Sequence, residues 1–193
     1  MDEFWVFGYG SLMWNPGFPH VESAKARLRG YRRSLCIYSW VHRGTESHPG
    51  LVLGLDRGGS CSGVAFRVAP EEWGSVLAYL RERELVTNVY KEKLLTLSLA
   101  DGRRVGGVVY VADPAHAQYA GSPETEVAAR IVDAASGISG PNDAYLFNTL
   151  TQLRAMGIHD HLLEEIARHV ENLRSSGAGR SHSGEMHANG AKT

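Results

Sequence analysis

The sequence predicts an α+β fold, in which a mixed sheet or small β-barrel is surrounded by helices. Strand-like patterns fill the first part of the chain around a single helix, and helical periodicity takes over from Pro123 onward. Strands and helices do not alternate as they do in a doubly wound fold, and we find no internal repeat. The 193 residues, 43% of them hydrophobic, suffice for one domain with a sizeable core.

The N-terminal part of the chain predicts several strands. Residues Glu3 to Phe7 form a short apolar run that stops at glycines, which is typical of a buried strand leading into a tight loop. Further strands are expected over 27–40 and 51–55. Apolar residues alternate with polar or small ones over 64–68, which predicts a half-buried strand there.

A helix and a hairpin follow these strands. Pro70 and two acidic residues supply a first helical turn, and the apolar residues after them recur at helical spacing, so a helix is expected to end near Glu84. Alternating leucines over 95–99, the turn Asp101-Gly102 and the apolar run 105–111 predict an antiparallel hairpin.

The C-terminal part is predicted to be helical over 124–135, 142–156 and 159–173. After Arg174 the chain contains mostly Ser, Gly, His and Ala, which bury too little apolar surface to offset the entropy of ordering. We therefore expect a domain over residues 1–174 and a disordered tail over 175–193.

Composition argues against several classes of partner. Twenty Lys and Arg against 21 Asp and Glu leave no strong field for nucleic acid or an anionic membrane. No apolar run approaches the roughly 20 residues that span a bilayer, and the N-terminus lacks a basic leader, so a cytoplasmic protein is expected. Cys36 and Cys61 lack CxxC spacing and lie in apolar stretches, which predicts buried structural thiols.

The segment Phe7 to Leu12 is rich in glycine and follows the first predicted strand. Met13 occupies the third glycine position of the dinucleotide fingerprint, and Pro16 argues against a following helix. Tyr9 and Met13 stand where a serine nucleophile elbow needs glycines around Ser11. Two interpretations remain, namely a tight turn and a loop that grips a small zwitterion through its backbone and the Ser11 hydroxyl.

Glu84 continues the apolar stripe of the helix from Pro70. Steps of about 100° per residue place it near Trp73 and Leu77, whereas Glu82 should face water. Burial raises a carboxyl pKa, and a raised pKa suits a general acid and base near neutrality. The alternatives are a frayed last turn and a simple ion pair with a neighbouring arginine.

Other polar residues are weaker candidates. Arg43 follows a long strand and offers a guanidinium that can hold a carboxylate by two hydrogen bonds. Tyr90 and Tyr145 can orient a substrate, although such phenols commonly belong to the core or its rim. The histidines in 159–161 are two residues apart and do not share a helix face, so no metal site is expected.

These residues together resemble a known family, the ChaC-type γ-glutamylcyclotransferases. The segment from Val6 to Trp14 closely resembles the N-terminal signature of that family, and the likeness covers the chain in family order up to the tail. It rests further on His42-Arg43-Gly44, Pro49-Gly50, Tyr79-Leu80, Arg83-Glu84, Asn142 and Tyr145-Leu146.

The resemblance implies a small distorted β-barrel with helices around it, and a lyase that converts glutathione to 5-oxoproline and cysteinylglycine without metal or cofactor. It implies that Glu84 is the catalytic acid and base. It also implies that the stretch from Val6 to Ser11 is the substrate-binding loop, and with the polar candidates above we expect one substrate-binding set. That set is Val6, Phe7, Gly8, Tyr9, Gly10, Ser11, Leu12, Arg43, Tyr90 and Tyr145.

Two other functions stay open from the sequence. The same loop would suit a cyclotransferase of broad specificity for γ-glutamyl amino acids or amines, although Leu12 and residues 42–44 favour glutathione. The other is a non-catalytic ligand-binding regulator linked to cation transport. An intact Glu84 argues against a pure binder, which has little use for an acid at that position.

Overall fold

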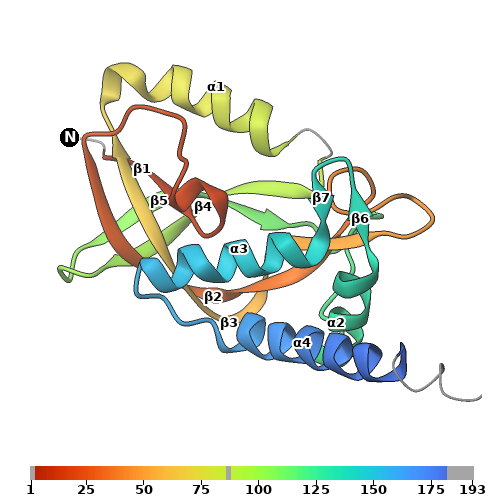
Figure 1. Ribbon diagram of the computed structural model, residues 1–193. Helices are drawn as coiled ribbons and strands as arrows, with labels where there is room; N and C mark the ends of the chain where they lie inside the picture. The colour runs from red at the N-terminus through yellow and green to blue at the C-terminus, as the bar shows by residue number, and fades with distance from the viewer. Residues whose placement is uncertain (1–2, 86–87, 182–193) are drawn as a thin grey trace, which may run out of the picture.

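The computed structural model describes residues 3–85 and 88–181, with side chains up to residue 176. Five strands close into a barrel in the order β1-β3-β2-β4-β5, which confirms the predicted α+β class and the barrel (Figure 1). All neighbouring pairs are antiparallel except β1 and β5, which run parallel and close the barrel. The strands are β1 (Phe4–Gly8), β2 (Glu22–Ser39), β3 (Gly50–Val68), β4 (Tyr90–Leu99) and β5 (Arg104–Ala112).

The two central strands are longer than the sequence predicted. β2 begins at Glu22, and the separate strands expected over 51–55 and 64–68 are one continuous strand, β3. Gly58 and Gly59 have positive φ angles of 98° and 66°, and the pairing with β2 shifts register close to this point. The glycines therefore bend the strand at a bulge, where the sequence pattern had suggested a break.

The predicted hairpin of β4 and β5 is confirmed. Gly102 at its turn has a φ of 92°, which glycine adopts without steric cost. Leu97 lies opposite Val105 in the register, and both are buried. Cross-strand pairs of this kind fix the register and keep the apolar face inside the barrel.

The helices also form close to where the sequence placed them. Figure 1 shows α1 along the upper side of the barrel, whereas α4 lies at the bottom of the view. Helices α2, α3 and α4 pack against one another, and the two-stranded sheet of β6 and β7 joins α2 to α3. The remaining elements are η1 (Ser11–Met13), η2 (Pro70–Glu72), α1 (Trp73–Glu84), α2 (Thr125–Ala134), β6 (Ser136–Gly137), β7 (Gly140–Pro141), α3 (Asn142–Ala155) and α4 (His161–Ser181).

The last helix is longer than the helix predicted over 159–173. α4 continues to Ser181, past the boundary expected after Arg174. Extending an existing helix adds a hydrogen bond for each residue without a new nucleation cost, so weakly apolar residues can follow a packed segment. The rest of the expected tail, 182–193, lies outside the described residues.

One hydrophobic cluster joins the barrel to its helices. Cys36 and Cys61 are both buried free thiols, as expected. Phe4 of β1 stacks on Trp73 of α1 with ring centroids 4.9 Å apart, which seats α1 on the barrel. In the part of the chain that the structure describes, no helix is long and apolar enough to cross a bilayer.

Candidate active site

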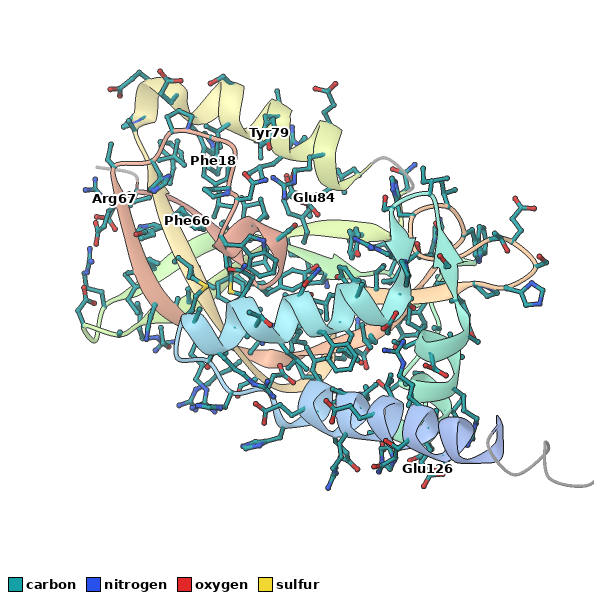
Figure 2. All side chains as sticks on the ribbon, viewed as in Figure 1. Phe18, Phe66, Arg67, Tyr79, Glu84 and Glu126 are labelled. Atoms are coloured by element: carbon teal, nitrogen blue, oxygen red, sulfur yellow. The ribbon has the colours of Figure 1, made fainter. Side chains whose placement is uncertain are left out.

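Glu84 is the last residue of α1 and its side chain is 19% exposed. The amide of Leu85 still donates to the carbonyl of Arg81, so the last turn of α1 is closed and not frayed. Figure 2 shows Glu84 on the side of α1 that faces the barrel strands. Its carboxylate borders a cavity of about 90 Å³, here called the Glu84 cavity. The other lining residues are Tyr9, Gly10, Ser11, Leu12, Leu53, Tyr90, Tyr110 and Tyr145.

The glycine-rich loop forms one wall of this cavity. β1 ends at Gly8, and the chain then turns into the short helix η1 before β2 begins, so the segment is not a tight turn between two strands. A Cβ atom on Gly8 would lie 3.1 Å from the Cβ of Leu12 and from the backbone nitrogen of Met13. A side chain at this position would require a shift of a few tenths of an ångström, so glycine suits the close packing of β1 against η1. Gly10 of the same segment lines the cavity.

A buried arginine holds the glycine-rich loop in place through a hydrogen bond to its backbone. Arg33 of β2 is 3% exposed, and its Nε donates to the backbone carbonyl of Tyr9 at 2.6 Å. Its two terminal nitrogens donate to the carbonyl of Ser62 at 2.7 Å and to Oδ2 of Asp160 at 2.8 Å. Asp160 also accepts a hydrogen bond from the amide of Leu163 at the start of α4, so this carboxylate has a structural partner on each oxygen.

Arg83 ties the same loop to α1. Its Nη2 donates to the hydroxyl of Ser11 at 3.0 Å, and its Nη1 donates to the carbonyl of Asn15 and to the hydroxyl of Tyr79, each at 3.0 Å. The Nε of Arg83 lies 3.3 Å from Oε1 of Glu84. One guanidinium thus fixes both the loop and the carboxylate, and the arginine pairing considered from the sequence does occur.

Side chains from α3 and β4 also line the cavity, and they cover the free edge of β3. Tyr90 donates from its hydroxyl to the carbonyl of Leu53 at 2.7 Å, and the amide of Leu53 donates to the hydroxyl oxygen of Tyr145 at 3.2 Å. Asn142 exchanges two hydrogen bonds with the backbone of Leu51, at 2.7 and 2.8 Å. These bonds satisfy backbone groups that lack a strand partner, and they hold both phenols at the cavity.

Electrostatics distinguish Glu84 from the phenols. Burial raises the pKa of Glu84 above its ordinary value, and the neighbouring Arg83 opposes this shift only in part. Burial also raises the pKa of Tyr9 and Tyr90 well above the ordinary phenol value, so both stay protonated at neutral pH. Among the lining residues that the structure describes, Glu84 is thus the group suited to exchange a proton near neutrality.

The structure brings most of the predicted site residues together and leaves four aside. Arg43 does not line the cavity, because its Nη1 donates to the carbonyl of Ser139 at 2.5 Å while its guanidinium lies 5.4 Å from the centre of the Tyr145 ring. The other three are Val6, Phe7 and Gly8, which belong to β1 and are buried.

Sequence reasoning missed two lining residues, Leu53 and Tyr110. Tyr110 interrupts the aliphatic run over 108–112 of β5, and a hydroxyl in such a run is a signal of a buried polar contact. Leu53 carries no comparable signal, because it contributes backbone groups and an ordinary core side chain.

A larger hollow of about 420 Å³ lies elsewhere, beside Ser98 and Leu99 at the other end of β4. No carboxylate lines it among the described residues, and its histidine, His159, has a side chain that is 70% exposed. It therefore lacks the desolvated acid that the Glu84 cavity provides. Within the described ranges, no three His, Cys, Asp or Glu residues gather closely enough to hold a metal ion.

Comparison with known proteins finds relatives that agree with one another in name and in fold. Residues 4–173 match the family described as ChaC-like protein. The glutathione-specific γ-glutamylcyclotransferase of Escherichia coli strain K12 is 38% identical over 169 residues, covering 88% of this chain and 73% of that protein. The human glutathione-specific γ-glutamylcyclotransferase 1 is 36% identical over 158 residues, covering 79% and 71%. A crystal structure of the yeast γ-glutamylcyclotransferase specific to glutathione superposes with a TM-score of 0.78 at 22% identity, covering 89% and 97%.

Proposed function

The chain belongs to the ChaC-like protein family, and from that premise we propose that it is a γ-glutamylcyclotransferase that cleaves glutathione. The observation that carries the proposal is the desolvated Glu84 carboxylate inside a cavity walled by the glycine-rich loop and tyrosine side chains. Relatives from a bacterium and a mammal that are named for this activity support glutathione as the substrate.

The reaction is an intramolecular ring closure. The α-amine nitrogen of the γ-glutamyl group attacks its own γ-carbonyl carbon, a new C–N bond closes a five-membered ring, and the old amide C–N bond breaks. The products are 5-oxoproline and cysteinylglycine, and no water is consumed. Because the nucleophile and electrophile are in one molecule, holding the folded conformer supplies a large part of the rate enhancement.

Glu84 is proposed as the proton carrier of this reaction. Its carboxylate accepts a proton from the α-ammonium, which frees the nitrogen lone pair, and it returns a proton to the departing amine of cysteinylglycine. A raised pKa suits both steps, because the group must take and give a proton near neutral pH. Backbone N–H groups of the glycine-rich loop are proposed to hold the substrate carboxylate or the developing oxyanion.

The hydroxyl groups of Tyr90 and Tyr145 offer the substrate different hydrogen-bonding roles, one as an acceptor and the other as a donor. The Tyr90 hydroxyl donates its proton to Leu53, so its oxygen offers lone pairs to the cavity. The Tyr145 oxygen accepts from the amide of Leu53, so its own proton is available to a substrate oxygen. A zwitterionic head needs this combination of acceptors and donors. The small cavity suits the γ-glutamyl group, with cysteinylglycine extending from its mouth.

The test is a 5-oxoproline release assay on glutathione and on several γ-glutamyl amino acids and amines. We expect glutathione to be turned over fastest and Glu84→Gln to reduce kcat by roughly 10²- to 10⁴-fold. Glu82→Gln is the matched control, because Glu82 is an exposed carboxylate on the same helix and should leave kcat unchanged. Equal turnover of all γ-glutamyl compounds would favour the broad-specificity enzyme instead.

A non-catalytic regulator of cation transport remains the rival function, and it predicts ligand binding without any 5-oxoproline release. The proposal includes a cytoplasmic location, which two reduced, buried thiols suit. An active Glu84→Gln variant would contradict the assignment of Glu84 while leaving the reaction itself in place.

A further inference from the structure

Tyr110 lines the Glu84 cavity, but its hydroxyl donates a hydrogen bond to a residue that does not line the cavity. It is 1% exposed, and its hydroxyl donates to Oε2 of Glu92 at 3.1 Å. Tyr110 and Glu92 are directly opposite each other in the register of β5 and β4. Their side chains therefore share one face of the hairpin, which is what brings the hydroxyl to the carboxylate.

Arg81 of α1 holds Glu92 in place by a bidentate ion pair. Its Nε donates to Oε2 at 2.8 Å and its Nη2 donates to Oε1 at 2.7 Å. Arg81 stands three residues before Glu84, one turn earlier on the same side of α1. The ion pair thus joins the helical turn that carries Glu84 to the hairpin that carries Tyr110.

The charge of Glu92 decides which way the Tyr110 proton points. Hydrogen bonds from Arg81 and Tyr110 hold the pKa of Glu92 below its ordinary value despite some burial, so this carboxylate is ionised at neutral pH. An ionised carboxylate only accepts hydrogen bonds, so the Tyr110 hydroxyl must donate to it. The remaining lone pair of the Tyr110 oxygen is then the part of the hydroxyl that is available to a ligand.

We propose that Glu92 is a positioning residue that fixes Tyr110 as a hydrogen-bond acceptor for the substrate's α-ammonium group. This inference rests on the proposed function and deepens it. Tyr90 also offers its lone pairs to the cavity, because its proton is engaged by Leu53. The two phenol oxygens and the Glu84 carboxylate give the cavity three acceptor groups, which suits the three N–H groups of an ammonium.

The experiment compares Glu92→Gln, Tyr110→Phe and the double variant on glutathione. In Glu92→Gln the new side-chain amide can donate to Tyr110 and turn its proton toward the cavity. We therefore expect KM to rise roughly ten- to hundredfold, the usual effect of losing a hydrogen bond to a charged group. Tyr110→Phe should raise KM similarly. The double variant should be no worse than the poorer single variant, because both remove the same contact.

Two further measurements separate ammonium recognition from a structural role. Glutaryl-cysteinylglycine lacks the α-amine and cannot cyclise, so its inhibition constant should be unchanged in both single variants. Glu22→Gln is the matched control, because Glu22 pairs with Arg67 and Arg103 on the barrel surface and does not line the cavity. It should leave the KM for glutathione unchanged.

Four results would count against these ideas. Additive effects of the two substitutions, or equal weakening of the glutaryl compound and glutathione, would overturn the role of Glu92 in an otherwise active enzyme. A fall in thermal stability with unchanged KM in Glu92→Gln would show a structural role only and would also overturn it. Wild-type protein that turns over no γ-glutamyl compound would contradict the proposed function.

Discussion

The Nε of Arg33 donates a 2.6 Å hydrogen bond to the backbone carbonyl of Tyr9, so a buried cation on β2 sets the position of the glycine-rich loop. The same guanidinium binds Asp160 just before α4 and the carbonyl of Ser62 on β3. The loop that borders the candidate active site is therefore fixed by the barrel and by the start of a helix far away in sequence. Its shape is a property of the whole fold.

Replacing Arg33 by Met should destabilise the protein strongly. The change leaves Asp160 without its cation and leaves the carbonyls of Tyr9 and Ser62 without donors, and breaking a buried pair typically costs about 3–5 kcal/mol. Urea unfolding followed by circular dichroism measures the loss. Arg27→Met is the control, because Arg27 is exposed on the same strand and, among the described residues, its side chain hydrogen-bonds only Ser60, so its effect should stay within about 0.5 kcal/mol. Equal unfolding midpoints for the two variants would contradict the role of Arg33.

Glu84→Gln should make the folded protein more stable at neutral pH. Burial raises the pKa of Glu84 in the folded state, so the stability present below the unfolded pKa of about 4.5 is lost as pH rises through the folded value. Glutamine stays neutral and avoids this loss. Arg83 keeps its bonds to Ser11, Asn15 and Tyr79 in the variant.

Urea midpoints of wild type and Glu84→Gln should therefore diverge as the pH rises above the unfolded pKa of about 4.5 and converge below about pH 4. Glu82→Gln, on the exposed side of α1, should show no such divergence. A Glu84→Gln variant that is less stable than wild type at pH 8 would mean that its pairing with Arg83 outweighs its burial.

Local patterns in the sequence were enough to predict the helix phase of Glu84 and the hairpin of β4 and β5, because both depend on neighbouring residues. The roles of Arg33 and Tyr110 depend on partners that only the closed barrel brings near. No residue spacing in the sequence therefore predicts these roles. The continuity of β3 was missed for a related reason. Glycines in a strand mark either a break or a bulge, and the pairing partner decides between them.

Gly63→Ala should destabilise the protein, whereas Gly106→Ala should not. A Cβ on Gly63 would collide with the backbone oxygen of Gly8 and lie 2.7 Å from Cζ of Phe7, so β1 would have to shift. Overpacking of this kind typically costs about 1–3 kcal/mol. At Gly106 the nearest atom is Cδ1 of Leu94 at 3.7 Å, so alanine fits and should be neutral or gain up to about 1 kcal/mol through the unfolded state.

Thermal unfolding of the two glycine variants measures this difference, and glutathione turnover adds a second readout. Because Gly8 is where β1 leads into the cavity loop, Gly63→Ala should also lower activity, whereas Gly106→Ala should not. Equal loss of stability in both variants would show that backbone flexibility, and not the contact with Gly8, explains the need for glycine.

The two thiols should be inert in the native protein. Burial raises the pKa of Cys36 to about 12 and that of Cys61 to about 11, so almost no thiolate is present at pH 8, and both sulfur atoms lie in the interior. We expect no reaction with Ellman's reagent over minutes in native buffer and release of two equivalents in denaturant. Ser75→Cys, at an exposed helix position, should react at once and serves as the control. Rapid labelling of the native wild-type protein would contradict this burial and would reopen a chemical role for one of the thiols.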